Sequence, residues 1–200
     1  RFMRGLVSEG NWRTPFNPRS SNHRSDDYCE GTAWQWTWFV PHDVDGLADL
    51  MGGRDAFIGK LDSLFTADSS LEGELVSADI SGLIGQYAHG NEPSHHIAHL
   101  YNYVGQPYRT QELVDEVLHT LYFNDPNGLS CNEDCGQMSA WYILNAMGFY
   151  QVCPGKPVYS IGRPLFNKAT IHLKDGKTFT ILAHNNSREN KYVQKMVLNG

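Results

Sequence analysis

The spacing of apolar residues constrains the fold of this chain more than any other feature, and it changes near residue 154. Before that point apolar residues recur every three or four positions, the period of an amphipathic helix. After it, short runs alternate apolar and polar residues, as half-buried strands do. We therefore expect a mainly α fold in which residues 1–152 are mostly helical and 153–200 are β-rich. The helical spacing covers five segments: 32–51 (split at Pro41), 54–65, 94–104, 108–122 and 136–147.

The C-terminal part contains a hairpin signal. Residues 170–174 and 178–182 alternate in character, and Asp175-Gly176 stands between them. This dipeptide accepts the positive φ angles that a tight hairpin turn requires. Residues 196–200 also have the pattern of a strand.

The first 32 residues have no sustained period and are rich in Gly, Pro, Asn, Ser and Arg. This composition predicts a long ordered loop. A loop of that length inside a compact domain usually has a functional role.

Composition excludes several classes of protein. The chain has 40% hydrophobic residues, enough for a buried core, and a net charge of -6 without a dense Lys/Arg block, so we expect no nucleic-acid partner. No run of 18 apolar residues occurs, and we expect no membrane span. The four cysteines are too few for a disulfide framework, and Cys131 and Cys135 lack the second ligand pair of a structural zinc site.

A single carboxylate precedes a tryptophan-rich helix start. Glu30 lies where the long loop meets the first helical segment, and Trp34, Trp36 and Trp38 follow it. Indole rings solvate a carboxylate poorly, which raises the pKa of the carboxyl group and suits it to donate a proton. Alternatively, Glu30 interacts with the N-terminal dipole of the helix and the tryptophans are core residues.

A second block combines an amide and a carboxylate. Asn91 and Glu92 precede the segment 94–104, and their oxygens are hard ligands suited to calcium. Alternatively, both residues only cap the helix that follows. His95 and His99 would share one face of an α-helix, but the glutamate that a zinc peptidase needs after the first histidine is absent.

A third block places two carboxylates, Glu133 and Asp134, in a turn before the segment 136–147. Capping explains one such carboxylate but rarely needs two. With Glu30 they provide an acid and a base on separate loops, the minimum for glycoside hydrolysis.

Together the three blocks closely resemble glycoside hydrolase family 92. Its members contain Glu-Gly-x-Ala-Trp-Gln followed by His-Asp-Val, then Gly-Asn-Glu-Pro-x-His-His, and then Gly-Asn-Glu-Asp-x-Gly-Gln-Met-Ser-Ala-Trp-Tyr. Here the blocks follow in the same order and begin at Glu30, Gly90 and Cys131. Residues 12–18 and Cys153-Pro154-Gly155 fit as well, so the resemblance covers nearly the whole chain.

The resemblance implies a fold and an activity. Family members have an N-terminal β-sandwich and a C-terminal (α/α)6 barrel, so residues 1–200 would be part of the barrel, without the sandwich. They use calcium to remove terminal α-linked mannose with inversion, and many cleave α-1,2 links. The implied partners are a mannose-containing glycan and the rest of the same polypeptide, in a secreted or periplasmic setting. Without the sandwich, residues 1–200 would lack part of the sugar-binding surface.

The resemblance also implies roles for individual residues. Glu30 corresponds to the catalytic acid, Asp134 is the preferred base and Glu133 is a second candidate. Asn91 and Glu92 correspond to the calcium site, to which a carboxylate of the third block could also contribute. Four further residues are expected near the sugar: Trp34, His95, His96 and Gln137.

Two positions depart from the family pattern. Thr32 stands where Asn is common, and Cys131 stands where Gly is usual. The sequence leaves two rival interpretations open. One is another (α/α)6 glycosidase that needs no calcium, and the other is a non-catalytic carbohydrate-binding helical module whose carboxylates only cap helices.

Overall fold

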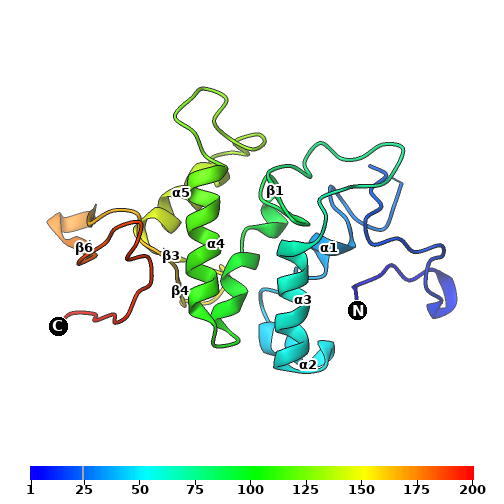
Figure 1. Ribbon diagram of the computed structural model, residues 1–200, viewed down its shortest axis with the longest axis horizontal. Coiled ribbons are helices and arrows are strands. Elements are labelled where there is room, and N and C mark those ends of the chain that lie inside the picture. Colours follow the sequence, from blue (N-terminus) through cyan, green and yellow to red (C-terminus); the bar gives the residue numbers. More distant parts are fainter. Residues whose placement is uncertain (24) are drawn as a thin grey trace.

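The computed structural model describes residues 1–23 and 25–200. Figure 1 shows an elongated molecule whose termini lie toward opposite ends, with α3 and α4 between them. The α-helices are α1 (Ala33–Trp36), α2 (Val44–Met51), α3 (Arg54–Thr66), α4 (Pro107–Thr120) and α5 (Gln137–Met147). The 3-10 helices are η1 (Ser8–Gly10), η2 (Glu92–Ser94), η3 (Ile97–Asn102) and η4 (Lys174–Gly176).

All paired strands are short and antiparallel. The pairs are β1 (Leu83–Ile84) with β2 (Tyr87–Ala88), β3 (Phe149–Tyr150) with β4 (Ser160–Ile161), and β5 (Lys168–His172) with β6 (Thr178–Leu182). The fold is thus a mixture of helices and small sheets, less helical than expected. The described residues form no closed ring of helices, because this part of the chain supplies too few helices to complete one.

The predicted helices occur close to their expected positions, with one exception. The segment 94–104 forms η2 and η3 instead of an α-helix. Its residues Ile97–Tyr101 are all buried, so no solvent-facing side exists. His, Ile, Tyr and Asn are weak helix formers, and packing on every side decides the conformation. His95 and His99 therefore do not occupy successive turns of an α-helix, contrary to the sequence-based expectation.

The core lies between α2, α3, α4 and η3. Phe57, Leu61 and Leu64 of α3 are fully buried, as are Val114 and Val117 of α4. These spacings of three and four residues place each set on one face of its helix. The core thereby fixes α3 and α4 on either side of the buried segment that precedes α4.

The predicted hairpin is present. β5 and β6 pair in register, and the turn residues Asp175 and Gly176 have φ angles of 63° and 71°. The strand expected at 196–200 is absent, because no described strand lies beside these residues to pair with their backbone. None of the described helices is long and apolar enough to span a membrane.

The N-terminal loop is held by hydrogen bonds to residues 68–77. The guanidinium of Arg19 donates to the carbonyl of Ser70 over 3.0 Å. The backbone N–H of Ser21 donates to the carbonyl of Glu72 over 2.8 Å. These bonds order the loop that leads to Glu30, as its composition predicts.

A buried ion pair attaches the C-terminal part to α4. Nη1 of Arg163 lies 2.8 Å from Oδ1 of Asp115, and the Arg163 side chain is only 3% exposed. Nη2 of Arg163 donates to the carbonyl of Ser187 over 3.0 Å. The guanidinium therefore joins α4 to the segment that follows β6.

Replacing Arg163 by Met should lower the free energy of unfolding by about 2 kcal/mol, because Asp115 would lose the cation that compensates its partial burial. Urea unfolding of the protein measures this change. The exposed Arg188 lies in the same part of the chain, and Arg188→Met should change stability by less than about 0.5 kcal/mol. Equal effects of the two substitutions would contradict this role for the ion pair.

Candidate functional site

Glu30 lies at the end of the long loop, two residues before the N-cap of α1. Its φ angle is 51°, in the left-handed region that non-glycine residues seldom occupy. Thr32 is the N-cap: its hydroxyl accepts from the N–H of Trp34 over 3.2 Å, and its own N–H donates to Oε1 of Gln35 over 2.7 Å. Thr32, the departure from the family's usual Asn, thus provides a capping box.

The turn around Glu30 depends on Gly31. Nε1 of Trp36 donates to the carbonyl of Cys29 over 2.7 Å, which places the indole across the turn. A Cβ atom on Gly31 would lie 2.6 Å from that nitrogen. A larger residue at 31 would therefore displace the ring and the backbone beside Glu30.

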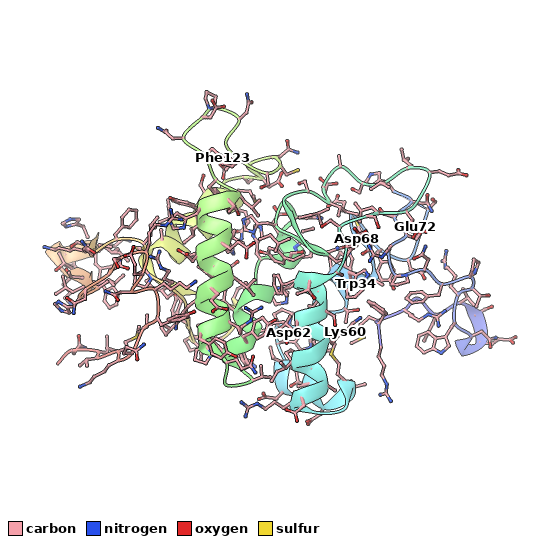
Figure 2. All side chains as sticks on the ribbon, in the orientation of Figure 1. Trp34, Lys60, Asp62, Asp68, Glu72 and Phe123 are labelled. Carbon is pink, nitrogen blue, oxygen red and sulfur yellow. The ribbon has the colours of Figure 1, made fainter. Side chains whose placement is uncertain are left out.

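The three tryptophans after Glu30 point to different neighbours. The ring of Trp34 packs edge-on against Phe2, that of Trp36 against Phe39 and that of Trp38 against Phe57. Figure 2 shows Trp34 close to Lys60 of α3, whose Nζ lies 3.9 Å from the indole centroid. The expected common indole environment for Glu30 is therefore not formed, because α1 is too short to align the rings.

Asn91 joins the second block to the first. Its Nδ2 donates to the carbonyl oxygen of Glu30 over 2.9 Å, and Asn91 is 7% exposed. Its Oδ1 forms no hydrogen bond within the described part of the chain. Asn91 therefore holds the strained backbone of Glu30 and leaves one amide oxygen available.

The third block forms a turn with consecutive left-handed residues. Asp134, Cys135 and Gly136 have φ angles of 51°, 57° and 91°. Glu133 accepts from the N–H of Ser139 over 2.9 Å and from its hydroxyl over 2.8 Å, so both oxygens of this carboxylate are engaged. These bonds lower the pKa of Glu133. Asp134 extends from the same turn as an exposed side chain.

Glu92 lies near both other carboxylates. Burial raises the pKa of Glu92, and the negative charges of Asp134 and Glu30 raise it further. The three blocks, remote in sequence, thus place three carboxyl groups within electrostatic reach of one another. None of them belongs to an ion pair within residues 1–23 and 25–200.

The donor atoms near Glu92 suit a hard cation only in part. The carboxylate of Glu92 and Oδ1 of Asn91 are oxygen donors, and a cation would relieve the crowding of negative charge. However, no three His, Cys, Asp or Glu side chains of the described residues lie close enough together to hold a metal ion alone. Calcium takes six to eight oxygens, so carbonyls, waters or residues outside this chain must complete any such site.

His95 and His96 are almost fully buried behind these carboxylates. Nε2 of His95 donates to the carbonyl of His89 over 3.0 Å, and Nε2 of His96 donates to that of Trp38 over 2.7 Å. Nδ1 of His95 therefore accepts from Nε2 of Gln137 over 3.2 Å. Each ring is thus assigned a neutral form with its proton on Nε2.

The structure adds two residues that the sequence did not single out, His89 and Tyr122. Nε2 of His89 lies 2.7 Å from the hydroxyl of Tyr122, which donates to the carbonyl of Met138 over 3.2 Å. His89 lies next to the predicted Gly-Asn-Glu block, but no spacing rule relates it to a tyrosine 33 residues away.

Comparison with known proteins identifies the family of the chain. The catalytic domain described as Glycosyl hydrolase family 92 matches residues 1–200. The chain belongs to glycoside hydrolase family 92. A family 92 α-mannosidase of Bacteroides thetaiotaomicron, solved with mannoimidazole, shares 43% identity over 96% of this chain and 26% of its own, with a TM-score of 0.88.

Two further proteins are similar to this chain. An inverting family 92 mannosidase of the same bacterium shares 42% identity over 100% of this chain and 28% of its own, with a TM-score of 0.82. A protein of Arthroderma benhamiae named as an uncharacterized secreted glycosidase is 32% identical over 90% of this chain and 22% of its own length. The family 92 chain thus spans about a quarter of these relatives.

The buried histidines predict acid sensitivity. Burial lowers the pKa of His95, His96 and His99 to about 4, whereas an unfolded histidine titrates near 6.5. The unfolded chain therefore binds more protons as pH falls from 6.5 toward 4, and stability declines in that window. Between pH 7 and 5 we expect a loss of about 1–2 kcal/mol for each histidine.

Urea unfolding at the two pH values measures this loss, and most carboxyl groups titrate below the window. Glu92 has the opposite sign, because its raised pKa favours the folded state as pH falls, but it is a single, partly exposed group. The exposed His184 gives a control, and His184→Gln should leave the pH dependence unchanged. Equal stability at pH 7 and 5 would contradict the assignment of neutral buried histidines.

Proposed function

We propose that the full-length protein containing this chain is a calcium-dependent exo-α-mannosidase that removes terminal mannose from glycans with inversion. The observation that carries this proposal is the convergence of Glu30 and Asp134, from separate loops, on Glu92. The named activities of the two Bacteroides relatives support an α-mannosidase, and the second supports inversion. We further propose α-1,2 specificity and, from the name of the fungal relative, a secreted or periplasmic location.

In the proposed reaction Glu30 is the general acid and Asp134 the general base. Glu30 protonates the glycosidic oxygen as the bond from that oxygen to C1 breaks. Asp134 removes a proton from a water molecule, whose oxygen forms the new bond to C1 from the opposite face. One water is consumed, and both carboxyl groups recover their starting protonation by exchange with solvent. This scheme requires carboxyl groups roughly 6.5–9.5 Å apart.

Asp134 is a better candidate for the base than Glu133. Both oxygens of Glu133 accept hydrogen bonds from Ser139, and these bonds lower the pKa of Glu133. Glu133 is therefore occupied in holding the start of α5. The side chain of Asp134 is hydrogen-bonded to that of Glu92, whereas Asp134 as a whole is exposed and can still contact water.

Asn91 and Glu92 are the proposed calcium ligands in this chain. Oδ1 of Asn91 and the carboxylate of Glu92 lie on adjacent residues, and Nδ2 of Asn91 remains bound to the backbone of Glu30. A bound calcium ion would coordinate sugar hydroxyl oxygens and supply positive charge beside the reacting ring. Asn91 would thus connect the metal site with the position of the acid.

The proposed sugar contacts use atoms that remain available. Oε1 of Gln137 and Nδ1 of His96 form no hydrogen bond in the described part of the chain, and both can accept from sugar hydroxyls. His95 supports this arrangement by holding the amide of Gln137. Trp34 is proposed to contact the glycan through its partly exposed ring.

The test is release of mannose from α-1,2-mannobiose by the full-length protein and three variants. Glu30→Gln and Asp134→Asn should each lower kcat by about 10³-fold, because each removes a proton-transfer group. Glu133→Gln is the matched control and should retain at least about a tenth of kcat, since it alters only a supporting bond. A larger loss in the Glu133 variant than in the Asp134 variant would reverse the assignment of the base.

Calcium dependence is measured in the same assay. EDTA should abolish mannose release and added calcium should restore it. Release that is indifferent to EDTA would indicate a calcium-independent (α/α)6 glycosidase. No release from any α-mannoside would favour the non-catalytic carbohydrate-binding module.

A further inference from the structure

We propose that the bridge from His89 through Tyr122 to the carbonyl of Met138 positions the turn that carries Asp134 relative to Glu92. His89 and Tyr122 would then be positioning residues for the hydrolysis, acting through the backbone without touching substrate. This inference rests on the proposed function for its kinetic consequences, whereas its structural consequence can be measured separately.

The carbonyl of Met138, at one end of the bridge, determines which group donates in each hydrogen bond of the bridge. A carbonyl oxygen only accepts, so the hydroxyl of Tyr122 donates its single hydrogen to Met138 over 3.2 Å. Nε2 of His89 must then donate to the oxygen of Tyr122 over 2.7 Å. This leaves Nδ1 of His89 to accept from the hydroxyl of Tyr87 over 2.8 Å. The bridge thus has one consistent arrangement of protons.

Both ends of the bridge are buried. His89, Tyr87 and Met138 are each 0% exposed. Polar groups in such surroundings are costly to leave without partners, so the bonds of the bridge resist breaking. Packing strengthens the same connection: the rings of Tyr122 and Trp141 are parallel, with centroids 6.0 Å apart, and His89 meets Trp141 edge-on at 4.3 Å.

The bridge connects the two segments that carry the carboxylates. His89 precedes Glu92 by three residues, and Met138 follows Asp134 by four in the first turn of α5. The N–H of Met138 also donates to the carbonyl of Glu133 over 3.3 Å. A displacement of Met138 would therefore also displace the turn that carries Glu133 and Asp134.

The turn needs such support because its backbone is strained. Asp134 and Cys135 have side chains in the left-handed region, a conformation that persists only when the surroundings determine it. The bonds of Glu133 and Asp134 to α5 lie within the turn and its own helix. Four connections reach the segment that carries Glu92: the bridge through Tyr122, the bond between His95 and Gln137, the bond of 2.9 Å from Nε1 of Trp141 to the carbonyl of His95, and the exposed side-chain bond between Asp134 and Glu92. Of these, the bridge through Tyr122 acts on the backbone carbonyl of Met138.

The test compares Tyr122→Phe with Tyr142→Phe in the full-length protein. Tyr142 is a matched control because its ring lies 4.9 Å from that of Tyr122, and its hydroxyl makes no hydrogen bond within the described residues. Two quantities are measured: kcat and KM for an α-mannoside, and hydrogen exchange of the backbone amides at 133–140.

Tyr122→Phe should lower kcat by about tenfold or more, since the base is displaced. KM should change less than kcat, because Gln137 is the only one of the proposed sugar contacts that lies in the displaced segment. It should also accelerate hydrogen exchange at 133–140, with exchange in the middle of α4 unchanged as a control for folding. Tyr142→Phe should change none of these quantities by more than about twofold.

Several results would overturn the inference. One is a Tyr122→Phe protein with unchanged exchange at 133–140, and another is faster exchange with unchanged kcat. Equal effects of both substitutions would show that the hydrogen bonds of Tyr122 are not the cause of the change. If the wild type releases no mannose, the proposed function fails, and the exchange comparison still decides whether the bridge holds the turn.

Discussion

The structure depends on satisfying buried polar side chains between residues 86 and 99. A buried donor or acceptor without a hydrogen-bond partner is costly. This segment contains several buried polar side chains, which therefore need partners. Three of these side chains reach different parts of the chain: Asn91 contacts the backbone at Glu30, His96 the backbone at Trp38, and His99 the side chain of Asn145 in α5. Residues 86–99 therefore set the relative positions of α1 and α5.

The candidate site lies at one edge of the segment 86–99. Glu30 and Asp134 both have left-handed backbone conformations. The carbonyl of Glu30 accepts a hydrogen bond from Asn91, and the carbonyl of Asp134 accepts one from the N–H of Gln137 at the start of α5. Such strain is a common feature of functional sites, because it fixes a side chain that ordinary backbone would leave mobile. General acid-base catalysis requires a carboxyl group held within hydrogen-bond reach of the proton that it transfers, and these backbone bonds hold the chain at Glu30 and at Asp134.

Much of the local structure follows from the sequence. The helices at 54–65, 108–122 and 136–147 and the hairpin at Asp175-Gly176 are present within one or two residues of their predicted limits. These elements have strong periodicity or turn chemistry, so neighbouring residues alone specify them. The segment 94–104 and the expected strand at 196–200 do not follow their patterns, because packing and strand pairing depend on residues far away in the chain.

The site could be predicted only in part for the same reason. Glu30, Glu92 and Asp134 are identifiable from motif and charge, but nothing in their spacing gives the convergence of the three loops. His89 and Tyr122 were missed, because a buried histidine and a distant tyrosine leave no periodic signal. The expected indole environment of Glu30 is not formed, because α1 ends at Trp36 and the rings of Trp34, Trp36 and Trp38 pack against different neighbours.

The most direct test of the account is the distance between the carboxyl groups of Glu30 and Asp134, measured in a crystal structure of the full-length protein bound to a non-hydrolysable mannoside. The account predicts a separation of roughly 6.5–9.5 Å, with a water molecule between Asp134 and C1 of the terminal sugar. A separation of about 5 Å, the spacing of a retaining enzyme, would contradict it. So would a sugar bound away from these two residues.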